Sequence, residues 1–89
     1  MYEESVGVPM ILVGAGVKAG ATCATPVSLT DCYATVLDAV GCKEAPPAGS
    51  ASLFDIAGGA DAGRGVISEY HATGSREAAF MLRQGKWKY

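Results

Sequence analysis

Residues 26–41 read PVSLTDCYATVLDAVG, and this stretch predicts the best-defined helix of the chain. Ser28 and Asp31 have the spacing of a capping box, with Asp in place of the usual Glu or Gln. Large side chains with apolar surface then recur at helical spacing on one side: Tyr33, Val36, Leu37 and Val40. Gly41 follows them and suits a helix C-terminal cap. We therefore expect a helix from about Leu29 to Val40, packed by its apolar side on a sheet.

Short apolar stretches on either side of this helix predict strands. Residues 9–13, PMILV, are apolar on both faces, which is typical of a central parallel strand. Residues 65–70, GVISEY, predict a second strand, and residues 78–89 predict a β-hairpin with its turn at Gln84-Gly85. The sequence therefore predicts an α/β fold with parallel strands, a packed helix and a C-terminal β-hairpin.

The connecting segments are rich in glycine and proline. Residues 14–20 and 58–65 are glycine-rich and predict loops, and the Pro-Pro pair within residues 44–49 predicts another. Residues 22–27 predict a weak extended piece, and residues 50–56 predict a short helix.

Composition indicates a piece of a larger globular protein. The chain has 89 residues, of which 49 % are hydrophobic and 18 % charged. A domain of this size buries only about 60–65 % of the surface of its unfolded chain. Soluble domains usually contain about 25 % charged residues. A free-standing miniature domain would need more polar surface than this chain offers.

Charge and hydropathy argue against nucleic-acid and membrane partners. The net charge is −2, and among the scattered basic residues only Lys86 and Lys88 form a close pair. A phosphate-binding face needs a concentrated basic stripe. The longest apolar run, residues 8–13, is too short to cross a bilayer, and the first residues do not form a signal peptide.

The cysteines do not predict a zinc site. Cys23, Cys32 and Cys42 lie far apart, form no CxxC pair and are distant in sequence from His71, the only histidine. We expect buried, reduced thiols, because free Cys packs as a small hydrophobe. One disulfide with a remaining free thiol is the alternative.

A glycine-rich loop offers a second function class. Residues 13–20, VGAGVKAG, follow an apolar run and resemble a dinucleotide-binding loop with the spacing GxGxxxG. That chemistry needs a helix N-terminus facing the pyrophosphate, yet the following ATCATP has no helical period. The alternatives to an enzyme segment are therefore a small binding module that uses Gly14–Gly20, or an interaction fragment that adds a strand to a partner.

Four segments, in order along the chain, resemble segments of the sulfatase family, within the alkaline-phosphatase-like superfamily. Residues 1–11, MYEESVGVPMI, resemble the family's YEE-S/G-V-R-V-P segment, and residues 26–41 resemble its VSLVDLYPTLLDLAG helix. Residues 68–71, SEYH, and residues 80–89, FMLRQGKWKY, resemble its SEYH strand and its MLRxGxWKY hairpin. Choline-sulfatase-type members are the most similar.

The resemblance implies a sulfuric ester hydrolase as the parent protein, acting on a small-molecule sulfate ester. Such enzymes use a formylglycine, made from Cys or Ser in a C/S-x-P-x-R motif, and calcium or another divalent metal. No Cys of this chain is followed by x-Pro-x-Arg. We therefore expect no catalytic residue, metal ligand or cofactor in these residues, and no activity from the chain alone.

The resemblance also divides the chain. Residues 1–77 correspond to part of the main α/β sheet lobe, and residues 78–89 to the start of a hairpin that leads to a C-terminal lobe. The family's metal ligands and catalytic lysine lie just upstream of the YEES segment, so we expect a truncated N-terminus and make no prediction of compartment. A truncated piece would expose apolar surface and self-associate.

Glu69, Tyr70 and His71 close the second predicted strand. Ligands of open α/β sheets bind outside the carboxyl ends of the strands. In choline-sulfatase-like members an acid at this place would face a cationic head group, and a carboxylate beside an aromatic ring suits a quaternary ammonium. We predict that these three residues bind substrate. The alternative is that Glu69 pairs with a Lys or Arg and that His71 is an ordinary loop residue.

Overall fold

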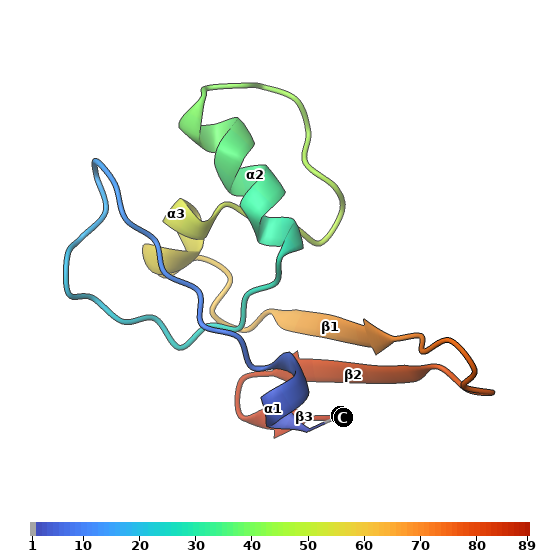
Figure 1. Cartoon of the computed structure of the whole chain (residues 1–89). Helices are drawn as coiled ribbons and strands as arrows, with labels where there is room; N and C mark the ends of the chain where they lie inside the picture. The colour runs from blue at the N-terminus through green and yellow to red at the C-terminus, as the bar shows by residue number, and fades with distance from the viewer. Residues whose placement is uncertain (1) are drawn as a thin grey trace.

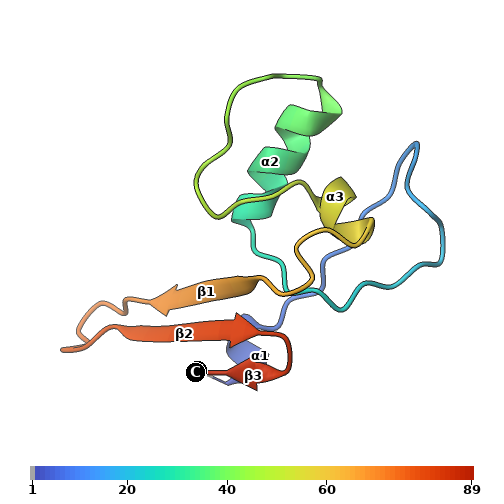
Figure 2. The same cartoon turned by 180° about the vertical axis from the view of Figure 1, so that it is seen from behind.

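A computed structural model describes residues 2–89. Its elements are, in chain order, α1 (Glu3–Val6), α2 (Thr30–Ala39), α3 (Leu53–Ala57), β1 (Gly65–Tyr70), β2 (Ala79–Gln84) and β3 (Trp87–Lys88). Figures 1 and 2 show two groups of elements, with α2 and α3 together on one side and the sheet with α1 on the other. The C-terminus lies beside α1 in both views.

The predicted central helix is confirmed as α2, whose ends are set by local signals. The Asp31 carboxylate accepts a hydrogen bond from the Ser28 N–H at 2.7 Å, which is one half of a capping box. At the other end Gly41 has a φ of 68°, in the left-handed region that glycine adopts without strain. The Gly41 N–H donates to the Asp38 carbonyl at 3.0 Å and so satisfies one of the last helical carbonyls.

The side of α2 that is buried differs from the prediction. The buried residues are Asp31, Ala34 and Thr35, whereas Val36 and Val40 are exposed. This face packs against α3, and both views show α2 standing away from the sheet (Figures 1 and 2). The expected packing of the apolar side on a sheet is therefore wrong for residues 2–89, because in them α2 packs on α3 through small and polar side chains.

Side chains of α2 fix the start of α3. The Thr35 hydroxyl accepts from the Leu53 N–H at 2.8 Å and donates to the Asp31 carbonyl at 2.6 Å. Ser52 is the N-cap residue, and its hydroxyl accepts from Phe54 N–H at 3.3 Å. These bonds hold the N-terminal turn of α3 against α2, while Leu53 and Ile56 are buried in the small core. The short helix predicted near residues 50–56 is thus formed over residues 53–57.

A buried ion pair joins this helical layer to the sheet. Asp31 is 0 % exposed, and its carboxylate accepts two bonds from the Arg64 guanidinium, at 2.8 and 3.0 Å. The Ala51 N–H also donates to it at 2.9 Å, and Arg64 donates to the Gly49 carbonyl at 2.8 Å. Arg64 directly precedes β1, so one carboxylate ties the start of α2, the loop before α3 and the start of the sheet.

These contacts also set the protonation of Asp31. Burial alone would raise the pKa of the Asp31 carboxyl, because a charge is poorly solvated inside a protein. The hydrogen bonds from Arg64, Ser28 and Ala51, together with the positive charge of Arg64, outweigh burial and lower the pKa below its ordinary value. The carboxylate is therefore charged and fully paired at neutral pH.

The sheet is antiparallel throughout, with strand order β1-β2-β3. The hairpin predicted over residues 78–89 is confirmed as β2 and β3, and Gly85 has a φ of 55° in its turn. Residues 2–89 contain no parallel strand pair of the kind that was predicted. Residues 9–13 form no strand, and Val13 is exposed, because a parallel strand needs neighbours for its N–H and C=O groups and residues 2–89 offer it none.

The first helix covers part of one face of the sheet. Glu3 of α1 places a carboxylate oxygen 3.4 Å from the Lys88 ammonium and 3.8 Å from the Arg83 guanidinium. All three side chains are at least one-third exposed, so these pairs add little to stability. They position α1 beside the hairpin more than they stabilise the fold.

Removing the Arg64 charge should lower the stability of the folded chain more than removing an exposed charge. We expect Arg64→Met to lower the free energy of unfolding by about 3 kcal/mol or more, because Asp31 would be left buried and unpaired. Arg76→Met, the same substitution at an exposed position, should change it by less than about 0.5 kcal/mol. Urea unfolding followed by circular dichroism measures both. Equal effects of the two substitutions would contradict the role given to the ion pair.

Candidate functional site

The three predicted substrate-binding residues lie at the carboxyl end of β1. Glu69 and Tyr70 are the last residues of that strand, and His71 follows it. Side chains alternate along a strand, so Glu69 and Tyr70 point to opposite faces of the sheet. Glu69 is paired across the ladder with Phe80 of β2, which places Phe80 on the same face.

Glu69, His71 and Phe80 form one cluster. The His71 Nε2 atom lies 3.1 Å from a Glu69 carboxylate oxygen. The His71 and Phe80 rings meet edge to face, with centroids 5.6 Å apart and planes at 85°. More than half of the Glu69 and His71 side chains is exposed. The structure therefore brings two of the predicted residues together, leaves Tyr70 on the other face, and adds Phe80.

The groups of this cluster can bind a ligand, and the cluster contains no Ser, Thr, Cys or Lys side chain. A carboxylate next to an aromatic ring attracts a cation, and an imidazole beside a carboxylate can exchange a proton. Sequence reasoning missed Phe80 because its place depends on the register of β1 against β2. The alternation within residues 65–70 and 79–84 shows which side chains share a face of each strand. Only the register between the two strands shows that Glu69 and Phe80 share a face.

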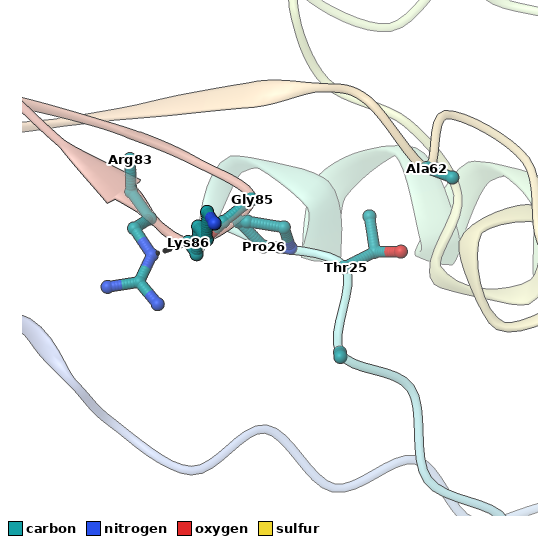
Figure 3. A pocket seen from close by; sticks show the side chains of 7 residues that line it. Thr25, Pro26, Ala62, Arg83, Gly85 and Lys86 are labelled. Atoms are coloured by element: carbon teal, nitrogen blue, oxygen red, sulfur yellow. Dashed lines mark hydrogen bonds between the residues drawn. The ribbon is translucent and has the colours of Figure 1, made fainter.

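A second candidate is a hollow between the hairpin turn and residues 24–26, shown in Figure 3. It measures about 480 Å³ and includes two basic residues, Arg83 and Lys86. Arg83 donates through Nε to the Gly85 carbonyl at 2.8 Å, and its guanidinium points away from Thr25 and Ala62 (Figure 3). The Lys86 ammonium lies 5.1 Å from the centre of the Trp87 ring. Both cations already have partners, so we assign no ligand to this hollow.

The cysteines are free thiols, and the prediction that they are buried is wrong for two of them. Cys23 and Cys42 are exposed, and Cys32 is half-buried. Hydrogen bonds from the side chain and the backbone of Thr25 lower the pKa of the Cys23 thiol. The exposure has a simple cause, because residues 23 and 42 lie outside the small core, in segments that form neither helix nor strand.

Residues 2–89 do not fit a metal centre. No group of three or more His, Cys, Asp or Glu side chains among them is placed to hold an ion. The carboxylate of Asp31, which has suitable chemistry, is fully used by Arg64 and two backbone N–H groups.

The glycine-rich loop does not form a phosphate cradle. Gly16 and Gly20 have φ values of 80° and 71°, which turn the chain, but residues 17–18 and 21–24 form neither helix nor strand. Helix α2 begins only at Thr30, so the loop does not open directly into a helix as a dinucleotide-binding loop does. The described part of the chain also holds no helix with the length and apolar surface needed to cross a membrane.

The comparison with known proteins supports the sulfatase resemblance. Over its whole length the chain is similar to curated sulfatases, which supports a sulfatase-family origin. The particular relatives are arylsulfatase K of Mus musculus, 36 % identical over 98 residues, of Danio rerio, 35 % over 95, and of Homo sapiens, 32 % over 98.

The likeness covers all of this chain but a small part of each relative. In each of these three cases it spans 100 % of the chain and 18 % of the relative, so the chain is about a fifth of their length. No protein-family model matches the chain. No solved structure matches it. The sulfatase resemblance predicted from the four sequence segments is thus supported at the level of the family.

Proposed function

We propose that this chain is a scaffold segment of a sulfatase that shapes part of the substrate pocket and supplies no catalytic group. The observation that carries the proposal is the likeness of the entire chain to one-fifth of arylsulfatase K. The geometry is consistent with it, since the ordered polar contacts around Asp31 are all internal and structural. Residues 1–77 would belong to the main lobe and residues 78–89 to the hairpin leading to a C-terminal lobe.

The parent enzyme in this proposal hydrolyses a sulfate ester. Its formylglycine and its divalent metal, calcium in the first instance, would be held by residues outside this segment. Two observations support that division. No C/S-x-P-x-R motif occurs in the sequence, and residues 2–89 do not fit a metal centre. No catalytic step is therefore assigned to the side chains of this chain.

The contribution to substrate binding would come from the end of β1. Glu69, His71 and Phe80 are exposed together at the end of β1 and the start of β2, with Tyr70 on the opposite face. A carboxylate beside an aromatic ring favours a cationic group on the substrate. The likeness to choline-sulfatase-type members stays a prediction, and it is the reason to test a quaternary ammonium first. An independent binding module is less favoured, because the glycine-rich loop forms no phosphate cradle.

The scaffold role predicts activity only in the context of a complete enzyme. We expect no turnover of 4-nitrophenyl sulfate by the isolated chain, with or without calcium. The matched stretch of mouse arylsulfatase K can be replaced by this chain, and we expect the chimera to fold and to hydrolyse the ester. The same chimera with Arg64→Met is the control. Because this substitution leaves Asp31 buried and unpaired, we expect the insert to be destabilised and the activity to fall. Turnover by the isolated chain, or an intact but inactive chimera, would contradict the proposal.

The binding role of Glu69 can be tested separately, by competition. In the chimera, Glu69→Gln should raise the inhibition constant of choline sulfate about two- to fivefold, because an exposed cation–carboxylate contact is worth about 0.5–1 kcal/mol. The KM for 4-nitrophenyl sulfate, which carries no cation, should not rise. Glu44→Gln is the matched control, at an exposed position in the segment that follows α2. An unchanged inhibition constant in Glu69→Gln would remove Glu69 from the pocket.

A further inference from the structure

Among the strand residues of the described chain, Glu69 is the only charged one on its face of the sheet. The other two, Arg83 and Lys88, are paired with each other across β2 and β3. Arg83 is also paired with Val66 of β1, and side chains alternate along a strand, so both basic side chains lie on the face opposite Glu69. Tyr70 lies on that opposite face as well. Both views show the end of β1 projecting beyond the three helices (Figures 1 and 2).

His71 takes the place beside Glu69 that a ligand cation would take. Its Nε2 atom lies 3.1 Å from a Glu69 carboxylate oxygen, and its ring centroid lies 5.6 Å from that of Phe80. A bound cation needs the same two partners, a carboxylate and an aromatic ring within about 6 Å. The connection between β1 and β2 also carries Arg76 and Glu77, but within residues 2–89 no ion pair joins either of them to Glu69 or His71.

We propose that protonated His71 competes with a cationic ligand for the Glu69 carboxylate, so that the ligand binds by displacing the imidazolium. The inference rests on the proposed function, which gives Glu69 a cationic group to bind. The displaced ring loses its added proton to the solvent, and no other bond forms or breaks. A neutral ring competes less, because a hydrogen bond without a charged donor is about half as strong.

The competition makes ligand binding depend on pH. Imidazoles gain and lose their charge between about pH 5 and pH 8, whereas carboxylates remain charged over most of that range. Acid therefore puts the positive charge of His71 beside Glu69 and weakens binding of a cation. Raising the pH removes that charge and strengthens binding.

The test titrates the 89-residue chain with tetramethylammonium, a quaternary ammonium that has no proton to lose. Amide resonances at the end of β1 follow binding by NMR. Because His71 is the only histidine, a single set of ring resonances follows its protonation. We expect the dissociation constant to rise about two- to fivefold between about pH 8 and about pH 5.5, as suits an exposed charge pair. By linkage, the ligand should move the ring titration to lower pH.

Two variants isolate the effect of His71. His71→Gln keeps an N–H donor beside Glu69 but cannot gain a proton, so its dissociation constant should not change over this range. Cys23→Ser removes a thiol whose lowered pKa brings its titration toward the upper end of the range. This second variant should keep the full pH dependence.

Each outcome decides for or against the competition. A dissociation constant that rises in acid for the native chain and for Cys23→Ser, but not for His71→Gln, supports it. Equal pH dependence in the native chain and in His71→Gln, or none in the native chain, would overturn it and leave the binding role of Glu69 intact. Absence of binding at every pH, or undiminished binding by Glu69→Gln, would overturn both.

Discussion

The rest of this structure depends on the hydrogen bonds that the buried Asp31 carboxylate accepts, above all those from Arg64. The apolar core is small, since the buried hydrophobic residues are only Ala34, Leu53, Ile56 and Met81 in the described chain. Such a core cannot by itself fix how the helices and the sheet are placed. Four hydrogen bonds to one buried charge do so instead, because the carboxylate must keep its partners or be desolvated without compensation.

This way of building a fold has a consequence for function. The Asp31 cluster organises the interior of the segment, and many large apolar side chains remain exposed. Among them are Ile67 and Trp87 of the sheet, Val36 of α2 and its C-cap residue Val40. A protein that orders itself through a polar cluster while exposing aromatic residues is organised like an internal part of a larger domain. The similarity to one-fifth of arylsulfatase K agrees with this organisation. The candidate ligand-binding residues Glu69, His71 and Phe80 lie together at one end of β1.

Local signals in the sequence predicted α2, α3 and the three strands but not α1, and long-range pairings could not be predicted. The capping spacing and Gly41 located α2, and the alternating pattern with Gly85 located the hairpin. Residues 9–13 have the composition of a central strand, but a strand forms only with neighbours to pair with. The buried side of α2 was missed because its partner is α3 and not a sheet. Asp31 was interpreted as a helix cap alone, since nothing in the sequence indicates that Arg64 reaches it across 33 residues.

The pH dependence of unfolding tests the central claim most directly. The pKa of Asp31 is lowered in the folded chain, so its contribution to stability is present above the ordinary value of about 4 and is lost as the pH falls through the lowered value. We propose measuring the free energy of unfolding of the native chain and of Asp31→Asn between about pH 6 and pH 2. The account predicts that the native chain is more stable at pH 6 and that the difference closes in acid. A difference that is absent at pH 6, or that persists unchanged into acid, would contradict it.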